Sequence, residues 1–198
     1  MKQLPRNKRI GITGGIGSGK SVLASLLEVY GIPVYIADVE SKRLTNESPI
    51  IREGLTDLFG ESLYTDAGLD KRKLASFIFT QPDNLKKVNA IIHPVVGDHF
   101  RRWVDGQETP YCAMESAILF ESGFDRCVDT TLMVYAPLEL RIARVQERDQ
   151  FSREEILKRI RNQLSDEIKK ERADYVIYND GHRALIPQVE AFLATLGL

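Results

Sequence analysis

A glycine-rich segment near the start of the chain constrains the fold more than any other feature. Residues 14–21 read GGIGSGKS and fit the pattern G-x-x-x-x-G-K-[ST], the phosphate-binding P-loop. Glycines let the backbone curl so that successive N–H groups point at one anion, and the following helix adds the positive end of its dipole. We expect Lys20 to reach the β- and γ-phosphates of a nucleotide and the Ser21 hydroxyl to ligate Mg²⁺. The residues of this segment predicted to bind ATP are Gly14, Gly15, Ile16, Gly17, Ser18, Gly19, Lys20, Ser21 and Val22.

The sequence around this segment has the pattern that the motif requires. A short β-prone run at residues 8–13 precedes it, and an apolar stripe of helical spacing follows over residues 20–30. Gly31 and Pro33 end the helix. The alternative to a P-loop is that the glycine-rich segment is a flexible turn that only caps the following helix. Such a turn does not require a strand before it.

Further short apolar segments predict the rest of a sheet. They lie at residues 34–37, 111–114, 130–135 and 175–178. Each is apolar on both faces, as buried parallel strands are, and the sequence between them has helical patterning. We therefore predict an α/β fold with a five-stranded parallel sheet. Two segments, 39–106 and 138–173, are too long to be simple crossovers between strands.

Composition excludes several classes of protein. The net charge of the 198-residue chain is −1, which gives no bulk attraction to nucleic acid or to an anionic membrane. No apolar run reaches the ~18 residues of a membrane span. The start is basic, with Lys2 and Arg6, but it lacks the apolar core of a signal peptide. Cys112 and Cys127 have no metal-ligand spacing, which predicts reduced thiols and a cytoplasmic protein.

Three carboxylates are predicted at the sheet edge that carries the loop. Asp38 follows the second predicted strand, Glu115 follows the third, and Glu121 lies six residues further on. Parallel strands end on one edge, where ligands bind. Carboxylates there can accept a proton from an attacking hydroxyl or help to hold Mg²⁺. The alternative for Asp38 is that it is the N-cap of a helix beginning at Val39. The alternative for Glu115 and Glu121 is a solvated surface position.

An arginine-rich segment follows the fourth predicted strand. It contains Arg141, Arg144, Arg148, Arg153, Arg159 and Arg161. The first three share one helix face because they are spaced three and four apart. Arginine forms planar, bidentate contacts with phosphate, which predicts a lid that closes over ATP and excludes water. The alternative is a solvated face paired with neighbouring acidic residues.

These features favour one class of P-loop protein over two others. A GTPase needs an N-K-x-D motif, which the chain lacks, and its D-x-x-G match at Asp57–Gly60 lies away from any predicted strand end. A non-enzymatic nucleotide-binding protein requires neither Asp38 nor a lid. The sequence therefore predicts one P-loop kinase domain over residues 1–198, similar to nucleoside-monophosphate kinases. Residues 39–106 form its helical substrate-binding insertion and residues 138–173 its arginine-rich lid.

The chain also resembles the dephospho-CoA kinase family over nearly its whole length. The segments that carry the resemblance are Ile12–Ser21, Ala37–Asp38, Gly68–Phe79, Val88–Pro94, Ile118–Glu121, Arg148–Asp149, Arg159, Gln163 and Ala173–Asn179. The family often has Asp, Arg and Pro where this chain has Ile36, Lys71 and Ala117.

The resemblance implies phosphorylation of the ribose 3′-hydroxyl of dephospho-CoA by ATP, the last step of CoA biosynthesis. It implies Mg²⁺ as cofactor, and ATP and dephospho-CoA as the only ligands, in a monomer or weak homo-oligomer. The catalytic residues are then Asp38 as base, Lys20 and Arg148. ATP also contacts Arg144 and Asn179. The predicted substrate contacts are Asp38, Lys71, His93, Glu115 and Glu121. The alternative acceptor is a nucleoside monophosphate or a sugar acid, which only the resemblance disfavours.

Overall fold

The computed structural model describes residues 7–198 and divides into two compact units. The first unit contains the described residues up to Ile36 together with Val104–Leu198. The second unit, Ala37–Trp103, is one continuous segment of the chain. Lys2 and Arg6 of the basic start lie outside the described residues.

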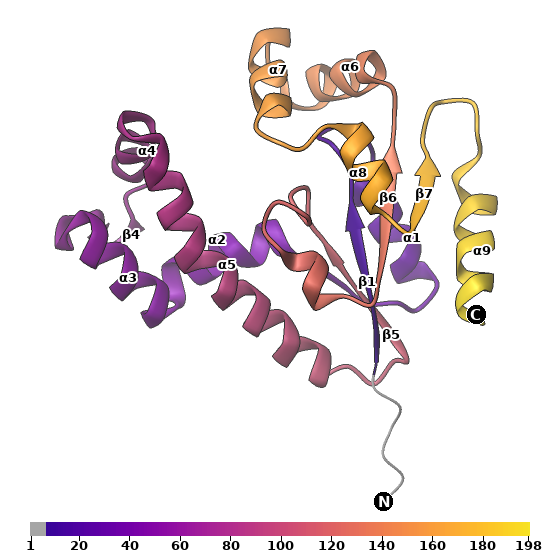
Figure 1. The fold of residues 1–198 in the computed structure, drawn as a ribbon, viewed down its shortest axis with the longest axis horizontal. Coiled ribbons are helices and arrows are strands. Elements are labelled where there is room, and N and C mark those ends of the chain that lie inside the picture. Colours follow the sequence, from indigo (N-terminus) through magenta and orange to yellow (C-terminus); the bar gives the residue numbers. More distant parts are fainter. Residues whose placement is uncertain (1–6) are drawn as a thin grey trace, which may run out of the picture. The chain divides into compact units, whose positions relative to one another are not determined.

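A five-stranded parallel sheet forms the centre of the first unit (Figure 1). The strands are β1 Lys8–Thr13, β2 Val34–Ile36, β5 Tyr111–Glu115, β6 Thr130–Tyr135 and β7 Tyr175–Tyr178. Their order is β2-β5-β1-β6-β7, and every neighbouring pair is parallel. The predicted fold class is confirmed, with each strand within one residue of its expected bounds. The central place of β1 puts the segment that follows it at the middle of the carboxyl edge of the sheet.

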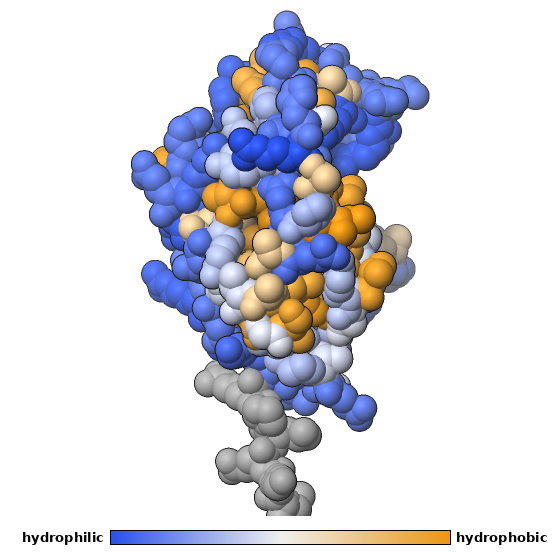
Figure 2. Space-filling model, turned by 90° about the vertical axis from the view of Figure 1, so that its right-hand side faces the viewer, coloured by the Kyte–Doolittle hydropathy of each residue, from blue (hydrophilic) through white to orange (hydrophobic). Residues whose placement is uncertain are grey.

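Helices α1 (Lys20–Val29) and α9 (Leu185–Leu196) bury their apolar stripes against this sheet. Ile10 and Ile12 of β1 are completely buried and share one core cluster with Leu23, Leu27 and Phe192 of these helices. Burial of such side chains contributes about 1.5–3 kcal/mol each. In Figure 2, apolar side chains also gather at the surface of the face that carries α9. The core therefore fixes β1 and α1, the two elements that hold the glycine-rich segment.

Three more helices of the first unit lie between β6 and β7. They are α6 Leu138–Asp149, α7 Arg153–Arg161 and α8 Asp166–Arg172. A capping box of Ser152 and Glu155 starts α7, and the Ser165 side chain caps α8. A small apolar cluster between α6 and α7 contains Ile142, Val145 and Ile156. The short 3₁₀ helix η2, Phe124–Cys127, precedes β6.

The second unit is mainly helical and has its own interior. Its elements are α2 Ala37–Glu47, α3 Pro49–Phe59, η1 Glu61–Leu63, β3 Tyr64–Thr65, β4 Gly68–Leu69, α4 Lys71–Thr80 and α5 Pro82–Asp105, which runs across the boundary between the units. The Tyr64 hydroxyl donates to the Thr45 carbonyl oxygen at 2.8 Å, and this bond ties the small β3–β4 hairpin to α2. The D-x-x-G match at Asp57–Gly60 forms the C-terminal end of helix α3. It does not follow a strand, in agreement with the prediction that it is not a GTPase motif.

No helix within residues 7–198 is long and apolar enough to cross a membrane. Cys112 and Cys127 are free thiols, and both are buried.

Candidate active site

The glycine-rich loop connects β1 to α1 and has a backbone that only glycine allows at key positions. Gly14 and Gly17 have φ values of 149° and 78°. A Cβ atom at Gly14 would lie 2.4 Å from the Val134 carbonyl oxygen, and one at Gly17 would lie 2.5 Å from the Arg141 carbonyl oxygen. Since both obstacles are backbone atoms, any side chain at these positions displaces the loop.

The loop ends at the positive end of helix α1. Gly19 is the N-cap residue, and no side chain caps this helix among the described residues. The Lys20 Nζ donates to the Gly15 carbonyl oxygen at 3.3 Å, so this ammonium group folds back over the loop. Ser21 is exposed at the second position of α1. Uncapped helix amides together with a lysine form an anion-binding site.

Buried polar atoms without a hydrogen-bond partner gather around this loop. Within residues 7–198 they are Thr13 Oγ1, Ser18 Oγ and Arg141 Nε. Thr13 precedes the loop and Ser18 belongs to it. The Arg141 guanidinium packs so closely on the loop that a Cβ at Gly15 would lie 2.2 Å from Nη1. Since buried polar groups are normally paired, their concentration here is typical of a functional site.

Of two residues predicted to bind ATP, Asn179 is hydrogen-bonded to the loop and Arg144 is hydrogen-bonded to Asn179. The Asn179 side chain donates from Nδ2 to the Ser18 carbonyl oxygen at 2.8 Å. Arg144 donates from Nη1 to the Asn179 carbonyl oxygen at 3.1 Å and from Nη2 to its Oδ1 at 3.3 Å. The segment after β7, helix α6 and the loop therefore meet at the carboxyl edge of the sheet.

The three arginines of α6 have different environments although they share one helix face. Arg141 is 2% exposed and forms an ion pair with Asp166 of α8. The Arg148 side chain is 62% exposed and forms an ion pair with Asp149 at 2.7 Å. Arg148 is accessible to a ligand. The solvated-face interpretation is wrong for Arg141, because Asp166 and Gly15 hold it in the interior, and the lid stays a prediction.

Glu115 and Glu121, predicted at the sheet edge, differ in their exposure: Glu115 is buried, whereas Glu121 is accessible to solvent and paired within the protein. Glu115 ends β5 and is 9% exposed. Glu121 accepts a hydrogen bond from the Leu164 N–H at 2.7 Å, and its Oε1 lies 3.1 Å from Lys169 Nζ. The alternative of a solvated surface position is therefore wrong for Glu115, whereas Glu121 is an exposed residue whose side chain is 20% exposed and paired within the protein. The contacts of Glu121 are those of an anchor within the protein, and its contact with substrate stays a prediction.

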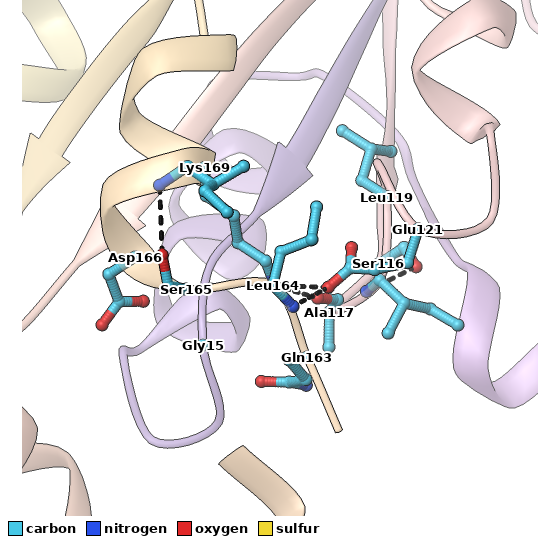
Figure 3. A network of polar contacts seen from close by, with 12 residues as sticks. Gly15, Ser116, Ala117, Leu119, Glu121, Gln163, Leu164, Ser165, Asp166 and Lys169 are labelled. Atoms are coloured by element: carbon cyan, nitrogen blue, oxygen red, sulfur yellow. Dashed lines mark hydrogen bonds and ion pairs between the residues drawn. The ribbon is translucent and has the colours of Figure 1, made fainter. Parts of the chain in front are cut away.

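Lys169 is the functional candidate that sequence reasoning missed. It is completely buried, and its Nζ donates to the Ala117 carbonyl oxygen at 2.7 Å (Figure 3 shows the network). Burial lowers the pKa of Lys169, and the attraction of Glu121 offsets this only in part. Its place among the charged residues of α8 gave no local signal of burial.

The second unit carries Asp38, Lys71 and His93. Asp38 is exposed at the second position of α2, which begins at Ala37. The predicted cap of a helix beginning at Val39 is therefore wrong, and Asp38 lies in the first turn, where a carboxylate stabilises the helix dipole. Lys71 is the exposed first residue of α4. Burial lowers the pKa of His93, so this imidazole is neutral at pH 7.

The site residues fit a magnesium ion that arrives with a nucleotide. Among the described residues, no group of three or more His, Cys, Asp or Glu side chains is arranged to hold a metal. Mg²⁺ usually keeps waters and binds few protein groups in addition to phosphate oxygens. The exposed Ser21 hydroxyl at the start of α1 offers one such oxygen.

A P-loop between the central strand and the first helix, with arginines on the adjoining helix α6, defines a small P-loop kinase. The model of the dephospho-CoA kinase family (CoaE) matches residues 8–184. The chain belongs to this family. A dephospho-CoA kinase of Bacteroides fragilis is 53% identical over 189 residues, which cover 95% of this chain and 92% of the relative. One of Porphyromonas gingivalis is 43% identical over 188 residues, with 94% and 93% covered.

Solved structures share the fold of this chain. The crystal structure of TT1252 from Thermus thermophilus has a TM-score of 0.83 and 39% identity, and the match covers 96% of this chain and 98% of that one. Dephospho-CoA kinase from Campylobacter jejuni has a TM-score of 0.65 at 21% identity, with 96% and 95% covered. A shikimate kinase from Bacteroides thetaiotaomicron has a TM-score of 0.55 at 13% identity, with 96% and 99% covered. The last two likenesses show the fold alone.

Proposed function

We propose that this chain transfers the γ-phosphoryl group of ATP to the ribose 3′-hydroxyl of dephospho-CoA, which gives CoA and ADP. The observation that carries the proposal is the family match over residues 8–184, which spans the loop, the second unit and the arginine-rich helices. The alternative acceptors, a nucleoside monophosphate or a sugar acid, are disfavoured by the same match. Likeness to shikimate kinases concerns the fold only.

Phosphoryl transfer depends mainly on positioning and on charge stabilisation. In our proposal the loop amides and Lys20 hold the β- and γ-phosphates, and the uncapped start of α1 adds its dipole. Ser21 would hold Mg²⁺, which would supply positive charge to neutralise the phosphates. The support for these roles is the folded-back Lys20 ammonium, 3.3 Å from the Gly15 carbonyl oxygen, and the accessible Ser21 hydroxyl.

In addition to the loop, arginines of α6 are proposed to bind the nucleotide. Arg144 is already tied to Asn179, and this pair is proposed to contact the adenosine part of ATP. Arg148 is proposed to stabilise the charge that develops on the transferred phosphoryl group. Its exposure supports this role, because among the described residues the guanidinium is paired with its neighbour Asp149, whose side chain is 27% exposed.

Asp38 is proposed to orient and deprotonate the attacking hydroxyl. A carboxylate at the start of a helix is exposed enough to meet a substrate, and general-base catalysis supplies about 10²–10⁴-fold in rate. Lys71, His93 and Glu115 are proposed substrate contacts. The neutral His93 acts as a hydrogen-bonding group rather than as a cation. We further propose a cytoplasmic enzyme that acts as a monomer or weak homo-oligomer.

A competition assay tests the acceptor. The purified chain is given ATP and Mg²⁺ with dephospho-CoA, AMP, CMP or gluconate, and ADP production is measured for each. We expect turnover with dephospho-CoA at least 100-fold above that with the others. A Lys20→Ala variant serves as the control for contaminating kinases. Turnover of another acceptor with none of dephospho-CoA would contradict the proposal.

A further inference from the structure

A short segment between the lid helices and the last strand holds the glycine-rich loop. Residues 163–169, named here the anchor segment, connect α7 to α8 and include the first turn of α8. Figure 3 shows Gln163, Leu164, Ser165 and Asp166 following one another close to Gly15 of the loop. This segment contacts the protein interior on one side and the loop on the other.

The interior side of the anchor segment is fixed by charged contacts. The Leu164 N–H donates to Glu121 at 2.7 Å. Lys169, which is completely buried, pairs with the same carboxylate at 3.1 Å and donates to the Ala117 carbonyl oxygen at 2.7 Å. Glu121 therefore accepts from both ends of the anchor segment. Two bonds to one carboxylate leave the segment little freedom to shift.

The loop side begins with Gln163. Its side-chain oxygen Oε1 accepts a hydrogen bond from the Ile16 N–H at 3.2 Å. Ile16 is the third residue of the loop, and its side chain packs against the apolar cluster of α6 and α7. Asp166 contributes a second link, because it pairs with the Arg141 guanidinium that packs on Gly15. The loop is thus held at two adjacent residues by one segment.

We propose that Gln163 is a positioning residue that fixes the phosphate-binding loop through the Ile16 amide, and that Lys169 acts through it by anchoring the segment. The proposal rests on the proposed function only in that the loop binds ATP. Gln163 itself contacts neither the transferred phosphoryl group nor the acceptor in this scheme. It sets the conformation in which the amides of the loop converge on one anion.

The expected effect follows from preorganisation. Without its acceptor the partly buried Ile16 N–H is unsatisfied, and this disfavours the present loop conformation relative to others. The apparent affinity for a ligand falls in proportion to the fraction of loop that remains competent. A neutral hydrogen bond of ordinary strength corresponds to a loss of about 3- to 10-fold in ATP affinity. Stability of the whole fold changes little, because the core is untouched.

The test uses the full chain and two readouts that need no dephospho-CoA. They are the ATP affinity measured by calorimetry and the rate of hydrogen exchange at the Ile16 amide. Gln163→Met keeps the length of the side chain and removes the acceptor, so we expect weaker ATP binding and faster exchange. Gln163→Glu keeps an acceptor oxygen, so exchange at Ile16 should remain slow although the added charge weakens ATP binding. Gln146→Met, at an exposed position of α6, is the matched control and should change neither readout.

A double-mutant cycle tests the role of Lys169. If Lys169 acts through Gln163, Lys169→Met weakens ATP binding alone but adds nothing to Gln163→Met. Additive effects would overturn that part of the proposal. A folded Gln163→Met protein that binds ATP within two-fold of wild type, or whose Ile16 exchange is unchanged, overturns the whole. If Lys169→Met does not fold, the Gln163 variants decide alone. Both readouts are taken without dephospho-CoA, so a failed dephospho-CoA assay does not affect this test.

Discussion

Replacement of Lys169 by Met is the most direct test of the polar network behind the loop. Met has a similar length but no charge, so the change leaves Glu121 without its cation and the Ala117 carbonyl oxygen without its donor. The Glu121 side chain is 20% exposed, and it still accepts the hydrogen bond from the Leu164 N–H at 2.7 Å. The remaining carboxylate is therefore only partly solvated and only partly paired.

The size of the effect follows from this geometry. Removing one partner of a fully buried ion pair costs about 3–5 kcal/mol, and the remaining exposure of Glu121 places this case near the lower value. We expect a loss of about 3 kcal/mol in the free energy of unfolding. For a chain of this length that corresponds to a fall of about 6–12 °C in Tm.

Thermal unfolding followed by circular dichroism gives the measurement. Lys86→Met is the control, because Lys86 and Asp83 form an exposed pair with side chains 84% and 79% exposed, and we expect almost no change in Tm. A second readout is pH. Burial lowers the pKa of Lys169 below its usual 10.5, so between the two values the unfolded state binds more protons and stability rises with pH. Lys169→Met should lack this contribution.

Two results would refute the reasoning. A Lys169→Met protein that melts within 2 °C of wild type means that the ion pair adds nothing to stability. An unchanged dependence of stability on pH below 10.5 means that Lys169 does not titrate as a buried group.

Four further predictions concern single residues. Lys20→Ala should weaken ATP binding about 100-fold in calorimetry, because charge-assisted bonds to phosphate are lost; unchanged affinity would remove the loop from the mechanism. Asp38→Asn should fold normally and lower turnover by about 10²–10⁴-fold with substrate affinities within a few-fold, and near-normal turnover would exclude a base. Arg148→Ala should lower kcat more than it raises the KM for ATP, with partial rescue by Lys, and wild-type kinetics would indicate a solvated residue. Burial raises the pKa of Cys112 to about 11, so between pH 9 and 11 the unfolded state loses this proton first and stability falls; urea unfolding of Cys112→Ala should show a smaller fall.

The strands were predictable because each is buried on both faces and reads as a short apolar run. The helix after the loop was predictable from its stripe and from Gly31, and it ends at Val29, within one residue of the expected end. The order of the strands was not predictable. It depends on which faces pack together across the whole chain, and no local pattern encodes that β5 pairs with both β1 and β2.

The loop was predictable from spacing alone, whereas the charged groups behind it were not. Arg141 reads as one of several surface arginines, and its burial depends on Asp166, which lies 25 residues away. Lys169 depends on Ala117, 52 residues away. Propensity and helical periodicity describe neighbours within a turn or two, so a buried charge with a distant partner is assigned to the surface. Asp38 shows a smaller error, since the start of α2 differed from expectation by two residues.

The position of β5 between β2 and β1 has a consequence for how the chain is made. Both neighbours of β1, β5 and β6, lie after residue 104, and among the described strands β2 pairs only with β5. A nascent chain that has emerged as far as Ile36 therefore carries two strands with no partner for either. The continuous segment Ala37–Trp103 leaves the ribosome next and can form its local helices first. The sheet forms only when β5 is inserted between β1 and β2, which are unpaired until then. Because this pairing is non-local, we expect the first unit to fold slowly and late.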